Sequence, residues 1–205
     1  LIHAAKAEAK VKAGDPFEVA ALDAERTRIS TLFRNYGYFY YQPGYASYLA
    51  DTLSRGGKVD LKMRLLDNLP AKARHKWYIG NIDLELRKQF METLNDTIRR
   101  RRLTVHFNGR KSPIRPRVIL RDLKLRSDSL YSYDRYLESS NKIVSTGIFS
   151  SVDFQFTPRD SSETCDTLDL RLNCIFDRPY DFYVETNYTG RTSGRMGPGL
   201  VIGLT

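Results

Sequence analysis

The stretch DAERTRISTLFRNYGYFY, residues 23–40, decides the fold together with YLESSNKIVSTGIFSSVDFQF, residues 136–156, which follows the same plan. In each, an amphipathic helical segment ends at a glycine, Gly37 or Gly147, and an aromatic or apolar strand-like segment follows. Glycine at a positive φ is a common helix stop. Repetition of a small α+β unit predicts an array of modules, and such arrays more often bind than catalyse.

Length and composition are typical of a globular protein. The chain has 205 residues, 41% hydrophobic and 28% charged, which is enough for one large or two small domains. No run of about 18 apolar residues predicts a transmembrane helix. The chain opens at Leu1 without an initiator Met, so we expect a segment of a longer protein. Two cysteines, Cys165 and Cys174, do not make a disulfide framework, and Cys174 is in phase with a run of leucines, which predicts a buried thiol.

The first half of the chain reads as a helix followed by strands. Apolar positions at helical spacing run up to Arg34, and Asn35–Gly37 predicts the stop. Residues 38–41 are an aromatic run that predicts a strand, and residues 45–53 predict another. Gly56-Gly57 then indicates a hairpin into the alternating residues 59–65.

The second half mixes strand and helix patterns. Residues 77–86 predict a strand, and Leu86 to Ile98, with apolar residues at spacing four, a helix that ends in the basic run 99–102. Strands are predicted at residues 104–107 and 118–125, and a helical pair over residues 129–145. Residues 152–156 and 168–176 predict a hairpin.

The last segment has a different character. Residues 181–189 and 200–204 alternate apolar with small or polar side chains, and glycines lie between and within them. Such alternation suits a hairpin of a membrane β-barrel, or an ordinary hairpin at the edge of a domain.

The residues also resemble a known family. The string Leu22–Ile29, followed by LFRNYGY at residues 32–38 and ADT at residues 50–52, resembles the periplasmic part of the outer-membrane BamA/TamA family, and within it the TamA-like lipoprotein branch of Bacteroidetes. The resemblance implies an α+β fold of tandem POTRA modules, each of order β-α-α-β-β with helices packed on a small mixed sheet. It implies that the C-terminal end forms the first strands of an outer-membrane β-barrel.

The resemblance implies three parts. Residues 1–70 would be a POTRA module whose first strand precedes Leu1. Residues 76–178 would be the barrel-proximal POTRA module, with an insertion near residues 87–117. Residues 179–205 would be the start of the β-barrel or a terminal hairpin.

The implied function is polypeptide binding in the periplasm of a Gram-negative bacterium. The chain would belong to an outer-membrane protein assembly or translocation factor and would engage extended segments by β-augmentation. Expected partners are unfolded outer-membrane or surface proteins, a periplasmic or inner-membrane translocation partner, and the outer membrane through an attached barrel. No nucleic acid is expected as a partner.

No catalytic or metal-binding constellation is found in the sequence. The histidines His3, His75 and His106 are scattered, and no phosphate-binding loop is present. We therefore expect no enzyme activity, no metal and no cofactor.

Peptide binding instead needs a free strand edge. Two predicted edges follow the helical stretches and form the candidate peptide-binding site: Tyr38, Phe39, Tyr40 and Tyr41, and Val152, Asp153, Phe154, Gln155 and Phe156. The alternative for these aromatics is that they fill the core. A further set is expected to have structural roles: Glu25, Arg26, Asn35, Gly37 and Gly147.

Two other functions stay open at this point. The net charge of +9 and the aromatic run 38–41 also fit a nucleic-acid-binding module that stacks bases. A periplasmic scaffold that binds only lipoprotein partners is the other alternative. The basic residues 99–102, 110–111, 115, 117 and 121 suit lipid head groups, an acidic partner or simply a solvated face.

Overall fold

The structure is a computed structural model that describes residues 6–53, 56–162, 164–177, 182–190 and 196–204. Within these residues the helical segments are two short 3-10 turns and four α-helices: η1 Lys6–Glu8, α1 Val19–Asn35, η2 Pro43–Tyr45, α2 Ala71–Arg74, α3 Pro116–Asp122 and α4 Tyr133–Val144. The strands of the described residues are β1 Ala46–Asp51, β2 Asp60–Leu65, β3 Tyr78–Arg87, β4 Asp96–Arg100, β5 Leu103–Phe107, β6 Phe149–Pro158, β7 Thr167–Phe176, β8 Phe182–Gly190 and β9 Met196–Leu204.

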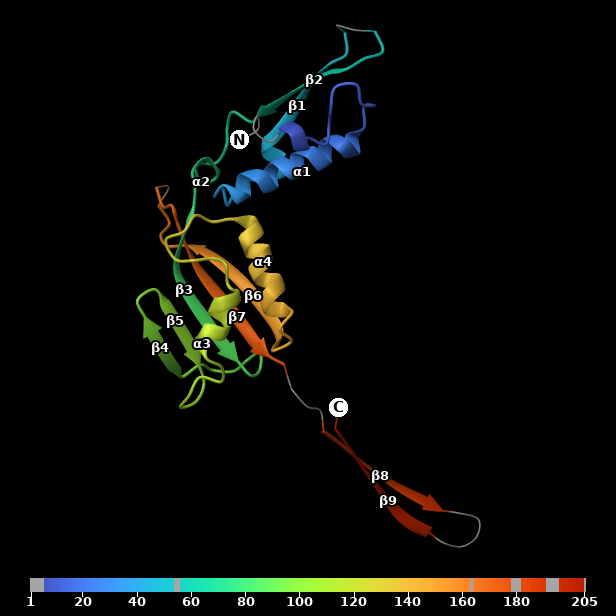
Figure 1. The fold of residues 1–205 in the computed structure, drawn as a ribbon, viewed down its shortest axis with the longest axis vertical. Helices are drawn as coiled ribbons and strands as arrows, with labels where there is room; N and C mark the ends of the chain where they lie inside the picture. The colour runs from blue at the N-terminus through green and yellow to red at the C-terminus, as the bar shows by residue number, and fades with distance from the viewer. Residues whose placement is uncertain (1–5, 54–55, 163, 178–181, 191–195, 205) are drawn as a thin grey trace.

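The central sheet has five strands in the order β4-β5-β3-β7-β6 (Figure 1). β5 and β7 both run parallel to β3, and the antiparallel strands β4 and β6 form the two edges. The expected small mixed sheet is therefore present. Along residues 78–176 the order is β3, α3, α4, β6, β7, with the β4–β5 hairpin inserted after β3. Apart from that hairpin, this is the β-α-α-β-β order expected of a POTRA module.

The core of the central sheet lies on the face that α3 and α4 cover (Figure 1). Strand alternation sends every second side chain of β3 inward, and Leu84 and Leu86 are almost fully buried there. Ile119 of α3 and Ile143 of α4 pack onto them as part of one cluster. The buried thiol expected at Cys174 is confirmed, and burial raises its pKa to about 12.

The N-terminal part consists of α1 and the β1–β2 hairpin, which lie together in Figure 1. β1 and β2 pair antiparallel from Ala46↔Leu65 to Asp51↔Asp60, as the double glycine predicts, and Gly57 has a φ of 72°. One long helix, preceded by η1, takes the place of the expected helix pair. The short helix α2 then leads into β3.

The predicted strand at residues 38–41 is wrong. These residues form turns between α1 and η2, with the backbone N–H of Tyr41 donating to the Tyr38 carbonyl at 3.0 Å. The β propensity of these aromatic residues did not decide their structure, because their rings pack on residues of other elements. The first strand after α1 is β1 instead.

Two more predictions in the inserted region are wrong. The expected helix from Leu86 to Ile98 is instead the end of β3, a turn and the start of β4. Phe90 is 76% exposed, so the apolar residues at spacing four do not form one buried helix face. The expected strand at residues 118–125 is instead the rest of α3, which ends at Asp122, and the irregular residues that follow it, since Pro116 starts a helix well at its first position. The predicted pair over residues 129–145 is the single helix α4, with α3 as its partner.

The C-terminal hairpin β8–β9 forms a two-stranded sheet of its own, paired from Phe182↔Leu204 to Gly190↔Met196. The strands expected at residues 181–189 and 200–204 therefore exist as a hairpin, except at residue 181, which lies outside the described residues. None of the described helices is long and apolar enough to cross a membrane.

Candidate strand-binding edge and aromatic junction

β6 presents one free edge of the central sheet. Its only strand neighbour among the described residues is β7, to which it pairs from Phe149↔Phe176 to Pro158↔Leu168. Val152, Phe154 and Phe156 are half-buried and pack against the core, with the rings of Phe154 and Tyr136 of α4 centred 5.3 Å apart. Asp153 and Gln155 point to the other face, where they are exposed and the Gln155 amide donates to the Asp153 carboxylate at 2.8 Å.

The candidate residues Tyr38–Tyr41 do not form an edge. Phe39 lies 4.9 Å from the Tyr131 ring and 5.3 Å from the Phe156 ring, measured between ring centroids. Tyr40 packs edge-on to Trp77 at 5.1 Å. The four residues therefore join the N-terminal part to the central sheet, and we call them, with Trp77 and Tyr131, the aromatic junction.

Tyr41 faces back toward α1. Its ring stacks on Phe33 at 4.4 Å, and its carbonyl accepts a bond from the Ser30 hydroxyl at 3.4 Å. Burial raises the pKa of Tyr41 to about 12. A hollow of about 370 Å³ beside it is lined by side chains of α1, the aromatic junction, the segment after it and α4: Thr27, Ser30, Thr31, Arg34, Phe39, Tyr40, Tyr41, Gln42, Pro43 and Tyr133.

Gly37 makes the corner that brings the junction together. Its φ is 95°, which the sequence anticipated, and its carbonyl accepts the backbone N–H of Trp77 at 2.8 Å. A Cβ at this position would lie 2.6 Å from Cδ1 of Leu130. The glycine thus serves both the turn and the close approach of α1 to the segment before α4.

Asn35, the last residue of α1, fixes the start of α4. Its side-chain oxygen accepts the backbone N–H of Asp134 at 2.8 Å, and its amide donates to the Asp134 carboxylate at 2.6 Å. Next to it, the Arg34 guanidinium lies 4.0 Å from the centre of the Tyr133 ring. A helix start needs partners for its first N–H groups, and here one partner comes from a distant helix.

Glu25 and Arg26 hold the N-terminal part. The Glu25 side chain is buried and accepts from the Arg28 guanidinium at 2.7 and 2.8 Å and from the Lys10 backbone N–H at 2.8 Å. Burial raises its pKa, but the bonds from Arg28 and Lys10 outweigh burial and lower the pKa below its usual value. Arg26 donates to the Pro43 carbonyl at 3.3 Å and pairs with Asp23 at 3.1 Å.

Gly147 lies in the turn after α4 with a φ of 66°, and no atom beyond its chain neighbours lies within 4 Å of where its Cβ would be. Its role is therefore the turn into β6 and not a close approach. The sequence suggests that Gly37 and Gly147 are equivalent. Both have a positive φ, but only Gly37 is closely packed against another residue.

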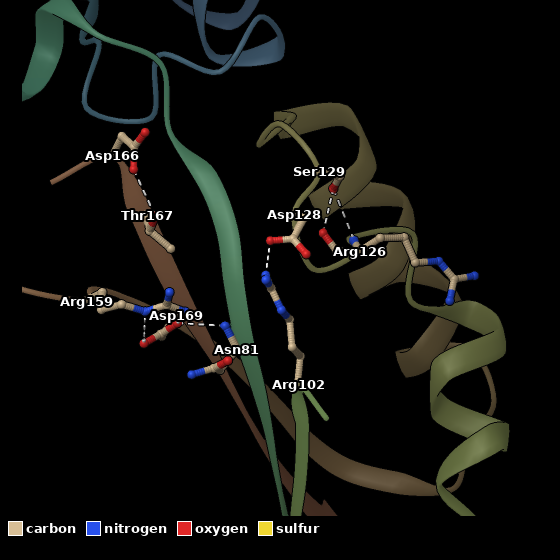
Figure 2. A network of polar contacts seen from close by, with 9 residues as sticks. All are labelled: Asn81, Arg102, Arg126, Asp128, Ser129, Arg159, Asp166, Thr167 and Asp169. Atoms are coloured by element: carbon tan, nitrogen blue, oxygen red, sulfur yellow. Dashed lines mark hydrogen bonds and ion pairs between the residues drawn. The ribbon is translucent and has the colours of Figure 1, made fainter. Parts of the chain in front are cut away.

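A polar network stabilises the outer face of the sheet near the start of β3 (Figure 2). Asp169 accepts from Arg159 at 2.7 Å and from the Asn81 backbone N–H at 2.7 Å. Gly80 allows this because a Cβ there would lie 2.2 Å from the Asp169 carboxylate. Figure 2 also shows Arg102, at the β4–β5 turn, paired with Asp128. Sequence reasoning predicted neither pair, because ten residues separate Arg159 from Asp169 and twenty-six separate Arg102 from Asp128, so no local pattern links them.

The basic residues lie on different elements, and two of them are paired with acidic neighbours. Arg99 and Arg100 lie on β4, Arg121 pairs with Asp122 at 3.2 Å, and Arg102 pairs with Asp128. Among the described residues, no group of three or more His, Cys, Asp or Glu is placed to hold a metal ion. Sequence reasoning missed that β4 is a second free edge, because it predicted a helix there.

The fold is similar to that of solved structures. BamA from Haemophilus ducreyi lacking POTRA domains 1-3 matches with a TM-score of 0.55 at 14% identity, over 93% of this chain and 29% of that one. The fold is POTRA-like. The POTRA1-3 region of the periplasmic domain of Omp85 from Anabaena matches 81% of this chain and 54% of that one, with a TM-score of 0.39 at 15% identity.

The chain thus spans less than a third of the length of the BamA structure that it matches. No protein-family model and no curated protein matches the sequence. The structural similarity to BamA therefore shows that the fold of this chain is POTRA-like.

Proposed function

We propose that this POTRA-like chain is the periplasmic polypeptide-binding segment of an outer-membrane protein assembly or translocation factor. Its β6 edge would receive extended segments of unfolded outer-membrane or surface proteins. The observation that carries the proposal is that β6 is a ten-residue strand at the edge of the central sheet, with β7 as its neighbour on one side.

The physical reason lies in the backbone. A strand at an edge leaves alternate N–H and C=O groups without a sheet partner, and an extended peptide can satisfy them. Val152, Phe154 and Phe156 anchor β6 to the core, so the edge is held in place before a peptide arrives. Such preorganisation lowers the entropic cost of binding.

The wider features of the proposal rest on organisation and sequence pattern. The separate pairing of β1–β2, the central sheet and β8–β9 supports a division into residues 1–70, 76–178 and 179–205. Residues 179–205 would begin a barrel in the outer membrane, on the alternation of their sequence. Placement in the TamA-like branch of Bacteroidetes rests on the sequence motifs at residues 22–29, 32–38 and 50–52.

The test is amide hydrogen exchange, read by NMR, on the 205-residue chain with a strand-forming peptide from an unfolded outer-membrane protein. We expect the outward-facing amides of residues 150–157 to exchange more slowly in the complex. The amides of β4, the other edge, are the internal control and should be unaffected by the peptide.

Other outcomes would contradict this function. Peptide binding with no added protection on β6 would exclude the edge as the site. Tight RNA binding that weakens steeply with salt would favour the nucleic-acid alternative, although the rings of residues 39–41 are packed on other rings. Crosslinks from Gln155 in cells to lipoproteins alone, without client proteins, would favour a scaffold.

A further inference from the structure

β4 is the second free edge of the central sheet. β5 is its strand neighbour on one side, and among the described residues no strand lies on the other. All five of its side chains are exposed, including Ile98 at 36%. An exposed edge of this kind is a template for another strand unless its residues oppose pairing.

The edge is held in a fixed position. β4 pairs with β5 without a bulge, from Asp96↔Phe107 to Arg100↔Leu103, and β5 pairs with β3 in the centre of the sheet. Arg102, in the turn after β4, is tied to Asp128 (Figure 2). The hairpin therefore presents β4 as a rigid strand.

The sequence of β4 is self-complementary when two copies pair antiparallel. With a two-fold axis at Ile98, Asp96 of one copy lies opposite Arg100 of the other, and the two Ile98 residues face each other. Alternation places these three residues on one face, that of Val105 and Phe107, their buried neighbours on β5. Asp96 and Arg100 have no ion-pair partner among the described residues.

Neighbouring registers are less complementary. An axis at Arg99 would place two arginines directly opposite each other, and it would bring Asp96 opposite Arg102, which is already paired with Asp128. An axis at Thr97 would place Asp96 opposite Ile98. Like charges directly opposite each other destabilise a strand pair, whereas opposite charges stabilise it. In the register centred on Ile98, Arg99 lies opposite Thr97 and Arg100 opposite Asp96, so no two arginines of different copies are directly opposite each other.

We propose that β4 docks a second copy of this chain, antiparallel and symmetric about Ile98, so that the central sheet continues from one copy into the next. This is an isologous interface, in which the same residues serve both copies. It uses the edge opposite to β6 and does not depend on the proposed function. It gives the inserted hairpin a role.

The interface is small, so the dimer is weak. Five residues per copy fall below the area of a stable interface, and the charge of +9 on each chain opposes association. Charges further apart than about 10 Å are largely screened at 0.1 M salt. We expect reversible dimers at a protein concentration of about 0.1 mM, and tighter pairing where copies are held close together.

Sedimentation velocity of the 205-residue chain over a range of concentrations tests the proposal by charge reversal. Asp96→Arg or Arg100→Asp alone should weaken dimerisation about tenfold or more, because each replaces two attractive pairs with two repulsive ones. The double variant, Asp96→Arg with Arg100→Asp, should restore it. Both sites, Asp96 and Arg100, are exposed, and circular dichroism checks that each variant is folded.

A crosslink tests the register. Ile98→Cys should give a covalent dimer with a short bis-maleimide, because the two copies meet at that residue. Lys62→Cys, on the exposed face of β2, is the matched control and should stay monomeric. The native thiols of Cys165 and Cys174 are buried.

Three results would overturn the proposal: a chain that stays monomeric at every concentration, a dimer that neither single reversal weakens, or single reversals that the double variant does not rescue. The last result, with binding of an acidic peptide to wild-type β4, would assign the edge to an acidic strand instead.

Discussion

The side chain of Asn35 caps helix α4 at Asp134, ninety-nine residues further along the chain. The Asn35 amide thus makes two hydrogen bonds between the end of α1 and the start of α4. It donates to the Asp134 carboxylate at 2.6 Å and accepts the Asp134 backbone N–H at 2.8 Å. The N-cap residue Ser132 makes a longer bond, at 3.5 Å, to the Arg135 N–H. The start of α4 therefore depends on the N-terminal part of the chain.

Asn35→Ala should lower the free energy of unfolding by about 1 kcal/mol, the usual cost of losing a helix cap. It should also speed amide exchange in the first turn of α4, because the N–H of Asp134 loses its partner. Urea denaturation and hydrogen exchange measure the two effects. Asn68→Ala, an exposed asparagine in the loop after β2, is the control and should change neither. Unchanged exchange in α4 would contradict the capping role.

Gly37→Ala should destabilise the protein by about 2–4 kcal/mol, since it adds backbone strain at φ 95° and a Cβ that displaces Leu130. Gly14→Ala is a close control because Gly14 has nearly the same φ, 96°, with open space around its Cβ. We expect only about 1 kcal/mol there. Equal losses in the two variants would mean that the contact with Leu130 costs nothing.

The single tryptophan, Trp77, reports on the aromatic junction. It is fully buried, and its ring contacts Tyr40 and His75 at 5.1 and 4.8 Å. Tyr40→Ala should shift the Trp77 fluorescence to longer wavelength, because water reaches the ring, and should cost about 2 kcal/mol of stability. Tyr38→Ala removes a ring that contacts Phe33 instead, so it should leave the emission unchanged. A shift in both variants would indicate general loosening.

The buried carboxylate of Glu25 predicts a pH dependence. Its pKa is lowered in the folded state, so its stabilisation is complete above the ordinary glutamate value of 4.5 and is lost as the pH falls through the lower, folded-state pKa. Glu25→Gln should cost about 1–3 kcal/mol at neutral pH, from the bonds to Arg28 and Lys10. Denaturant titrations of both proteins at several pH values should converge in strong acid. A difference that does not depend on pH would show that the charge of Glu25 is irrelevant.

Local patterns predicted the elements whose residues agree with their surroundings. The alternation in residues 59–65, 77–86 and 168–176 was correct because these strands bury one face only. The glycines at positions 37 and 147 were correctly placed as helix stops, because positive φ is a property of the residue itself. Where the pattern was ambiguous, as between Leu86 and Ile98, spacing alone favoured a helix, whereas the structure has the end of β3, a turn and the start of β4.

The sequence by itself determined the α+β class, the turn at Gly37, the helix-to-strand corner at Gly147, the buried thiol of Cys174 and most of the strands, since all of these follow from side-chain period and backbone preference. Only the tertiary structure decided that residues 38–41 form a junction and not an edge. Their rings pack on Trp77, Tyr131 and Phe156, which lie far away in the sequence. It also decided which strands lie at the edges: β6 was foreseen, but β4 became an edge through parallel pairing of β5 with β3, a contact that no local pattern encodes.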